Sequence, residues 1–194
     1  MDREDSSGGI RRKLVESKER WAREGRLLTG RESRPELADW RLAVDGLVET
    51  PLELDWAAFL ALPQTELATD IHCVTAWSRF DNRWTGVATR DLLGRACPKA
   101  EARFVVCHSH DGYTTNLPLD AFAAEDALVA HGWEGRPLAR EHGGPARVVV
   151  PQLYFWKSAK WVRRIELVAR DRPGFWEERG YHDNGDPWRE ERYR

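Results

Sequence analysis

Cysteine is scarce in this sequence of 194 residues, which holds three, at positions 73, 97 and 107. Their odd number and lack of short paired spacing argue against a framework of disulfide bonds. Charge of either sign is also not in large excess, because the net charge is −2, so there is no general electrostatic case for binding nucleic acid. No apolar run approaches the roughly 18–20 residues of a membrane-spanning helix, and we expect no membrane segment in this chain.

The N-terminal residues are polar and charged, and no apolar stretch follows the arginine pair Arg11-Arg12. We therefore read no secretory signal there and expect a cytoplasmic protein. Residues 1–30 are predicted to form a charged arm with room for a short helix. Residues 31–194 are predicted to form a single domain, since this length is enough for one substantial core.

Short strand and helix signals follow one another from residue 40 onward. Alternating runs flank Asp45-Gly46, which predicts a hairpin turn at that pair. Asp55 and Pro63 bracket an apolar segment and predict a helix that Asp55 caps. The segment "TELATDIHC" predicts a strand that ends in a loop, and "TRDLLGRA" predicts a helix capped by Thr89.

Further strands are predicted at "RFVVCHS", "GYTTNLPL", "ARVVVP" and "RIELVAR", and a further helical turn at "LDAFAAE". From Arg172 onward the chain is rich in proline, glycine and tryptophan, and we expect an extended tail that packs by its aromatic rings. Short strands mixed with short helices, without a regular strand–helix–strand repeat, predict an α+β domain rich in strands.

The stretch "DIHCVTAWSRFDNRWTGV" (70–87) raises a chemical question, because it places Cys73 where a strand passes into a loop. A buried structural cysteine is the plain interpretation, since such a thiol packs as a small hydrophobe. The polar side chains of Asp70, His72 and Arg79 crowd the same segment and favour a functional thiol instead. Loops that a rigid scaffold presents are also where reactive side chains concentrate.

Two other interpretations of the cysteines stay open. A zinc site could use Cys73, Cys107, His108 and His110, although the close paired spacing of structural zinc ligands is missing. A nucleophilic cysteine–histidine pair is also chemically possible, but no local signature supports it.

A basic segment at residues 136–164 offers a partner for Cys73. Its basic side chains lie among glycines, aromatic rings, Ser158 and an apolar strand, against a single acidic residue, Glu141. Glycine lets the backbone approach a ligand closely, and hydroxyls, free N–H groups and basic side chains are what a phosphate needs. Together with a thiolate, this pattern predicts a metal held by an organic ligand that carries a phosphate. The seven basic residues are Arg136, Arg140, Arg147, Lys157, Lys160, Arg163 and Arg164.

Three motifs, "HCVTAWSRFDNRWTGV", "EHGGPARVVVP" and "YFWKSAKWV", occur in an order that resembles the sulfite oxidase superfamily of molybdopterin enzymes. The likeness is strongest to small stand-alone bacterial members and covers about residues 37–194. The chain is too short to hold as well the haem and immunoglobulin-like domains of animal sulfite oxidase. The resemblance implies a sulfite-oxidase-type α+β fold.

The resemblance also implies a molybdenum cofactor, bound through a pterin dithiolene, with the Cys73 thiolate as the protein ligand of the metal. The implied pterin contacts are His142, Arg147, Ser158, the backbone of Ala159, Lys160 and, more loosely, Ser109. The implied activity is oxygen-atom or electron transfer on a small sulfur- or nitrogen-oxo substrate, with an electron partner protein of unknown identity. A non-catalytic binding module that retains the fold is the competing interpretation.

Overall fold

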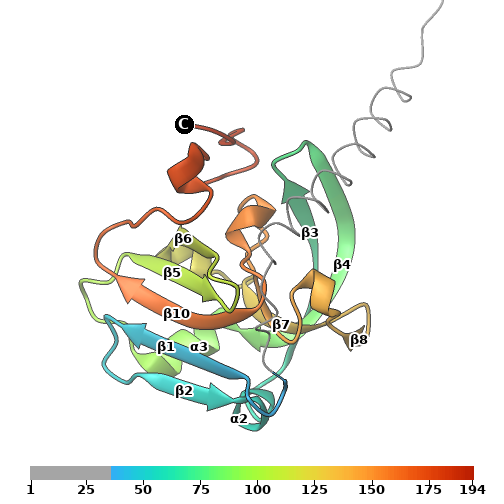
Figure 1. Cartoon of the computed structure of the whole chain (residues 1–194), viewed down its shortest axis with the longest axis vertical. Helices are drawn as coiled ribbons and strands as arrows, with labels where there is room; N and C mark the ends of the chain where they lie inside the picture. Colours follow the sequence, from blue (N-terminus) through green and yellow to red (C-terminus); the bar gives the residue numbers. More distant parts are fainter. Residues whose placement is uncertain (1–35) are drawn as a thin grey trace, which may run out of the picture. The chain divides into compact units, whose positions relative to one another are not determined.

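The computed structural model describes residues 36–194, so the arm predicted over residues 1–30 lies outside the described residues. A first sheet has five strands in the order β2-β1-β10-β5-β6 (Figure 1). Strand β10, late in the chain, pairs in parallel with β1 and antiparallel with β5, and thereby joins two antiparallel pairs. The strands are β1 (Arg41–Gly46), β2 (Leu52–Asp55), β5 (Phe104–Ser109), β6 (Thr114–Pro118) and β10 (Val162–Val168).

A second sheet has the order β3-β4-β7-β8, with β9 also paired to β7. Strands β3 and β4 form a long hairpin, with Cys73 opposite Trp77 at its tip. The predicted strand ending at Cys73 is confirmed, but the loop predicted after it is wrong, because the chain turns back at once into β4. The strands are β3 (Thr65–Cys73), β4 (Trp77–Ala88), β7 (Leu128–Trp133), β8 (Arg136–Pro137) and β9 (Arg147–Val149).

The helices are short and begin where the sequence signals them. Asp55 caps the first, since its carboxylate accepts a hydrogen bond of 2.8 Å from the backbone N–H of Ala58. The cap predicted at Thr89 is wrong, because Thr89 lies inside α3 and its hydroxyl donates to the carbonyl oxygen of Phe122 instead. The elements are α2 (Trp56–Leu60), α3 (Thr89–Ala96), α4 (Leu119–Phe122), and the 3₁₀ turns η1 (Arg140–His142), η2 (Phe155–Lys157) and η3 (Glu177–Arg179).

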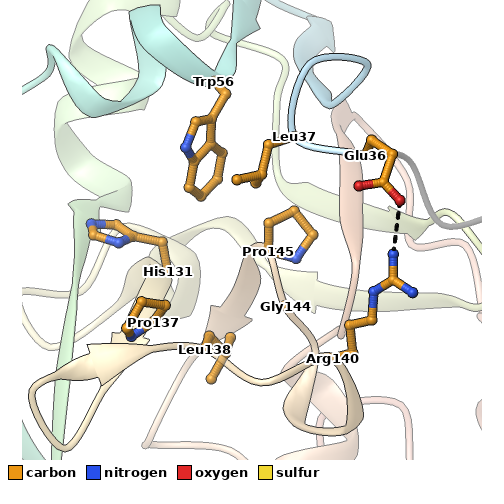
Figure 2. Close-up of a pocket in the computed structure, with 9 residues that line it drawn as sticks. All are labelled: Glu36, Leu37, Trp56, His131, Pro137, Leu138, Arg140, Gly144 and Pro145. Atoms are coloured by element: carbon orange, nitrogen blue, oxygen red, sulfur yellow. Dashed lines mark hydrogen bonds and ion pairs between the residues drawn. The ribbon is translucent and has the colours of Figure 1, made fainter.

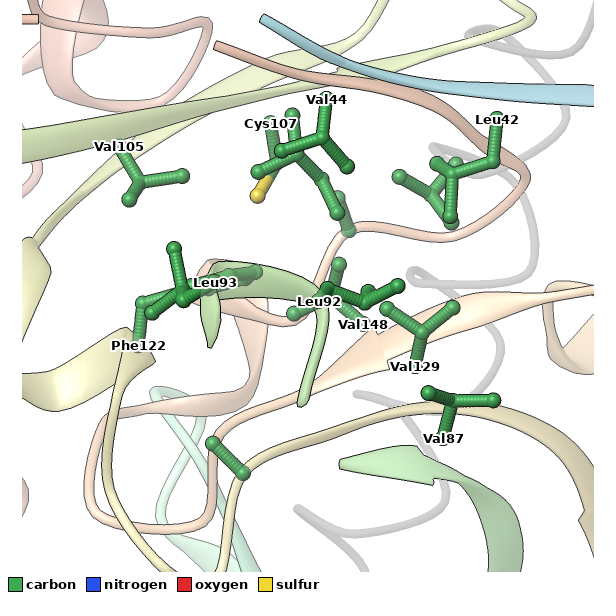
Figure 3. Packing of buried hydrophobic residues seen from close by; sticks show 14 of the residues in the cluster. Leu42, Val44, Val87, Leu92, Leu93, Val105, Cys107, Phe122, Val129 and Val148 are labelled. Atoms are coloured by element: carbon green, nitrogen blue, oxygen red, sulfur yellow. The ribbon is translucent and has the colours of Figure 1, made fainter. Parts of the chain in front are cut away.

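The main core lies between the two sheets and around α3. Alternate residues of a strand point to opposite faces of the sheet, so Leu42 and Val44 of β1 enter the core while Ala43 and Asp45 face outward. Figure 3 shows these side chains gathered with Cys107 and with residues of α3, α4 and the second sheet. A smaller apolar cluster covers the other face of the second sheet, and it contains Ile71, Trp84, Leu128, Ala130, Leu138 and Val149.

The turn predicted at Asp45-Gly46 is misplaced, although β1 and β2 do form an antiparallel hairpin. Strand β1 continues through this pair, which lies beside Glu166 and Leu167 of β10. Gly46 has a φ of +84°, and a Cβ built on it would lie 2.3 Å from the carbonyl oxygen of Leu167. The glycine therefore permits a close approach of two backbones rather than a tight turn, and the chain reverses towards β2 within residues 47–51.

The strand-rich α+β domain predicted from the sequence is confirmed, with strands at all four segments that predicted them after residue 103. Within residues 36–194, no helix has the length and the apolar content to cross a membrane.

Gly46→Ala should destabilise the fold more than Gly112→Ala, which is a matched control. Both glycines have φ values near +85°, at +84° and +88°, but nothing lies within 4 Å of a Cβ at Gly112. Left-handed backbone alone costs about 1–2 kcal/mol for an alanine, and the clash with Leu167 should add about 1–3 kcal/mol at Gly46. Equal free energies of unfolding for the two variants in urea titrations would contradict the close approach.

Candidate functional site

Cys73 lies on the outer face of the second sheet. It follows Ile71 by two residues, so both side chains point to the same face, and Ile71 packs in the apolar cluster there. Trp77, directly opposite Cys73 in the hairpin, packs against that cluster too. The cysteine is half-buried, and its Sγ lies 3.1 Å from the hydroxyl of Thr75. The hairpin thus carries the thiol at its tip, on the side where the second cluster lies.

Arg147 enters the same face from β9 and is buried. Its guanidinium donates hydrogen bonds of 2.8 Å to the carbonyl oxygens of His142 and Ser158 and one of 3.4 Å to that of Val148. It also lies 4.1 Å from the ring centroid of Phe155, a residue packed against the outer cluster. One side chain therefore ties the loop before β9 to the end of η2.

The buried charge of Arg147 has no carboxylate partner within residues 36–194. Burial lowers the pKa of this guanidinium to about 9. A buried cation is costly unless an opposite charge compensates it. The structure therefore places an uncompensated positive charge where an anionic ligand would stabilise the protein.

The loop before β9 closes directly on Lys160. Gly143 has a φ of +108°, and a Cβ there would lie 3.0 Å from the Cβ of Lys160 and 3.1 Å from that of Arg147. The Lys160 ammonium donates a 2.8 Å hydrogen bond to the carbonyl oxygen of Glu141, and Trp161 donates through its backbone N–H to the carbonyl of Gly143 at 3.1 Å. A glycine is required because three chain segments meet at this point.

His142 stands at the edge of this meeting point. Its ring lies 5.1 Å from that of Trp133, and the guanidinium of Arg79 lies 4.2 Å above the same Trp133 ring. Burial lowers the pKa of His142, and the positive charges of Lys160, Arg147 and Arg79 lower it further, while Glu141 opposes them. The imidazole is therefore neutral near pH 7 and can either accept or donate a hydrogen bond.

The segment after η2 runs beside β9. The Ser158 hydroxyl accepts a 3.0 Å hydrogen bond from the N–H of Val150, and the carbonyl of Ala159 accepts one of 2.9 Å from Val148. In the part of the chain that the structure describes, the backbone N–H of Ala159 donates to no acceptor. We call His142, Arg147, Ser158, Ala159 and Lys160, which these contacts bring together, the cradle.

Ser109 lies on the first sheet, beside the segment that directly follows the cradle. It ends β5 opposite Val162, while the next residue, His110, donates its backbone N–H to the carbonyl of Trp161 at 2.9 Å. The Ser109 hydroxyl is buried and has no hydrogen-bond partner among residues 36–194, and the same holds for Nε2 of His110. Buried polar atoms without a partner call for an explanation, such as an absent ligand or water.

The basic segment at residues 136–164 is only partly gathered at this site. Arg147 and Lys160 belong to the cradle, but Lys157 is buried against Glu177, with 2.7 Å between Nζ and Oε1. Arg164 pairs with Asp45 at 2.9 Å on the first sheet. Only some basic residues of this segment therefore lie at the cradle, because neighbouring residues of strands and tight turns point in different directions.

The zinc interpretation is wrong for the residues it named. Cys107 is buried in the main core, which raises the pKa of its thiol to about 12. His108 faces the other side of β5 and bonds Glu166 through Nε2 at 2.9 Å. Across residues 36–194 no three histidine, cysteine or acidic side chains gather as metal ligands.

A separate pocket of about 230 Å³ lies against the loop before β9, and Gly144 and Pro145 of that loop line it. Figure 2 shows its lining, with the rings of Trp56 and His131 on one side, Gly144 and Pro145 on another, and the Glu36–Arg140 ion pair at the rim. His131 packs its ring near Phe59 of the main core, so it points away from the cradle. None of the predicted site residues lines this pocket.

The sequence offers Trp77, Trp84, Trp156 and Trp161 as candidate walls of the cofactor pocket. Trp84 and Trp77 do lie in or against the smaller apolar cluster, and the Arg147 guanidinium lies 5.8 Å from the Trp84 ring centroid.

Trp133 and Phe155 are not among those candidates. The Trp133 ring contacts both the His142 ring and the Arg79 guanidinium, and the Phe155 ring contacts the Arg147 guanidinium. The signal available in the sequence was the high number of tryptophans, ten in all. That number does not tell which rings line a site and which fill a core.

Comparison with known proteins matches residues 31–176 to the family model described as an oxidoreductase molybdopterin binding domain. The chain belongs to this family. It is 50% identical over 158 residues to "Uncharacterized oxidoreductase YuiH" of Bacillus subtilis, with 81% of this chain and 80% of the relative covered. It is 31% identical to the "Protein-methionine-sulfoxide reductase catalytic subunit MsrP" of Burkholderia mallei, over 76% of this chain and 51% of the relative.

Among solved structures, the chain is similar to the sulfane dehydrogenase SoxCD from Paracoccus pantotrophus, with a TM-score of 0.64 and 26% identity. That match covers 70% of this chain and 40% of the other. This chain thus spans about half of the MsrP relative and less than half of the SoxCD chain. The sulfite-oxidase-type fold predicted from the sequence is confirmed.

The chain is therefore a molybdopterin-binding oxidoreductase, and the described residues fit that cofactor. Among residues 36–194, Arg147 is a buried cation without a protein anion, and the Ser109 hydroxyl is buried without a partner. Gly143 lets Lys160 and Arg147 approach the same loop closely. A phosphate-bearing pterin offers an anion and many hydrogen-bonding groups to such a site. The individual contacts remain predictions.

Lys160→Glu should lower the content of pterin and molybdenum in the purified protein more than about tenfold. A charge-assisted hydrogen bond contributes about 1.5–3 kcal/mol, and each 1.4 kcal/mol is about a factor of ten in binding. Arg136→Glu, an exposed charge reversal on β8, is the control and should leave both contents unchanged. Equal contents in the two variants, with folding verified by circular dichroism, would show that Lys160 holds no cofactor.

Proposed function

We propose that this protein is a molybdenum-dependent oxidoreductase that transfers an oxygen atom or electrons on a small sulfur- or nitrogen-oxo substrate, with Cys73 as the protein ligand of the metal. The observation that carries the proposal is the position of Cys73 on the same sheet face as the buried, uncompensated Arg147. A thiol and an anion-binding group on one face are what a metal held by an anionic organic ligand requires.

The residue types agree with these roles. A soft thiolate suits a redox-active molybdenum centre. When bound, the cofactor supplies the oxygen-atom and electron transfer, while the protein contributes binding, orientation and electrostatics. Arg147 and Lys160 would hold the anionic part of the cofactor, and Ser158 and the free N–H of Ala159 would add hydrogen bonds.

The surroundings of His142 favour an oxygen-bearing substrate. Arg79, Lys160 and Arg147 create a positive potential around a neutral imidazole, with Trp133 as an apolar wall. An oxyanion, or the polarised oxygen of a sulfoxide, is stabilised by such a potential. Because the MsrP relative is described as a protein-methionine-sulfoxide reductase, a sulfoxide is the first substrate to examine.

A catalyst of this family is expected to contain molybdenum, whereas a non-catalytic module that only retains the fold is not. Cys73→Ser should abolish molybdenum-dependent turnover and leave the fold intact, because a serine oxygen is a much harder ligand than a thiolate. Cys97→Ser is the control, since Cys97 is exposed at the end of α3, on another element. The measurements are molybdenum and pterin per chain and turnover with an artificial electron carrier. Undiminished turnover in the Cys73 variant would refute the ligand role.

Sulfoxide reduction and sulfite oxidation run in opposite directions, so two assays distinguish these substrate classes. We expect the loaded protein to oxidise a reduced viologen dye when methionine sulfoxide or dimethyl sulfoxide is added. Sulfite with ferricyanide as the electron acceptor is the opposing assay. Turnover with sulfite and none with either sulfoxide would reject sulfoxide reduction. A purified protein that contains neither molybdenum nor pterin would favour the non-catalytic module.

A further inference from the structure

The C-terminal tail reaches the turn that carries Cys73. The guanidinium of Arg192 donates a hydrogen bond to the carbonyl oxygen of Val74, and the ring of Trp188 lies 5.1 Å from that of His72. These two contacts bracket Cys73 in the sequence. Residues 177–194 lie outside the segment that matches the family model, which ends at residue 176. The contact is therefore made by a part of the chain that the family's common domain does not include.

The same arginine also holds the segment that leads into the cradle. Arg192 lies 5.0 Å from the ring centroid of Tyr154, and Tyr154 donates its backbone N–H to the carbonyl of Gly185 at 2.7 Å. Tyr154 stacks on Trp156 of η2, with 5.2 Å between the centroids. One tail side chain thus contacts both the tip of the β3–β4 hairpin and the residues just before Ser158.

A buried ion pair fixes the start of the tail to η2. Lys157 and Glu177 are both fully buried, 2.7 Å apart, and Lys157 donates a further 2.8 Å hydrogen bond to the carbonyl of Asn116. Glu177 accepts from the indole N–H of Trp156 at 2.9 Å and from the hydroxyl of Thr115 at 3.0 Å. Removing one member of such a pair leaves a buried charge alone, which is strongly destabilising. Detaching the tail from η2 would therefore strongly destabilise the folded protein.

Apart from the tail, the described contacts of the turn at residues 74–76 are the β3–β4 pairing at its base, where Cys73 lies opposite Trp77, and hydrogen bonds of its own. Its own hydrogen bonds are short-range, between the N–H of Ala76 and the carbonyl of Cys73 at 3.0 Å and between Sγ of Cys73 and Thr75 at 3.1 Å. Thr75 and Ala76 are exposed, and Ala76 has a φ of 65°. A strained and exposed turn keeps one conformation only if other parts of the structure hold it.

We propose that residues 177–194, the C-terminal strap, fix the position of the Cys73 turn relative to the cradle, and that Arg192 is the positioning residue. In Figure 1 the strap is the dark red segment beside η2 and the β3–β4 hairpin. The inference relies on the proposed function only for the role of Cys73 as a ligand. The position of the turn can be measured without the metal.

The test compares Arg192→Gln with Arg189→Gln in the full chain, prepared without cofactor. Arg189 is another arginine of the strap. It is 73% exposed, and within residues 36–194 its one ion pair is with Glu191 at 3.4 Å. The rate at which a maleimide modifies Cys73 is measured by mass spectrometry. Exposed Cys97 and buried Cys107 serve as internal references in the same molecule.

Arg192→Gln should raise the Cys73 rate relative to Cys97 by about tenfold, the factor that corresponds to about 1.4 kcal/mol. Arg189→Gln should leave the ratio unchanged, and Arg192→Lys should restore part of the protection. In the loaded protein, Arg192→Gln should also speed amide hydrogen exchange at Val74–Ala76. A Cys73/Cys97 ratio equal to wild type in Arg192→Gln would overturn the proposal.

Modification of Cys107 would reveal that Arg192→Gln unfolds the whole domain. The decision then rests on Trp188→Ala, because this ring is 79% exposed and its removal spares the core. A raised Cys73 ratio in that variant supports the strap, and an unchanged ratio rejects it. Undiminished turnover in Cys73→Ser would reject the proposed ligand role and leave these labelling results in force, so the two failures are distinguishable.

Discussion

A buried positive charge without a protein counter-ion is the constraint on which the site depends. Within residues 36–194, Arg147 is held by carbonyl oxygens and aromatic rings. Such groups fix the orientation of the guanidinium, but they do not offset the free energy that the charge loses when it leaves water. The segments that supply the carbonyls, the loop before β9 and the end of η2, are therefore held around a charge that only an external anion compensates. Stability and cofactor binding are coupled at this residue.

The contrast with Lys157 shows two uses of a buried cation in one short segment. Lys157 has its carboxylate partner inside the protein, Glu177, and serves to attach the tail. Arg147 lies against the opposite side of η2 and has none within the described residues. A sequence shows both as basic residues near glycines and rings. Only the fold decides which positive charge is available to a ligand.

Periodicity predicted much of the fold, and where it failed a distant partner decided. Alternating apolar runs marked β3, β5, β6, β9 and β10. Strand β4 carries Arg79, Asp81 and Arg83 on its exposed half, so its sequence does not show a strand pattern. Its pairing with β3 and β7 makes it a strand. Asp45-Gly46 is interpreted as a turn from the sequence alone, because the residue that requires the glycine, Leu167, lies far along the chain and its approach cannot be read from the local sequence. The cradle residues came from motif resemblance. Trp77 and Trp84 could be named as candidate walls from the sequence, but Trp133 and Phe155 required the coordinates.

The central strand of the first sheet, β10, is also the last strand of the chain. During synthesis β1 and β5 therefore emerge from the ribosome with unpaired edges and wait for residues 162–168. Open edges of this kind invite pairing with other chains, and long-range pairing is slow to form. The cradle lies just upstream of β10, so its final shape is reached only after residues 162–168 have been synthesised. A nascent chain that stops before β10 would therefore combine two open strand edges with an unfinished cofactor site.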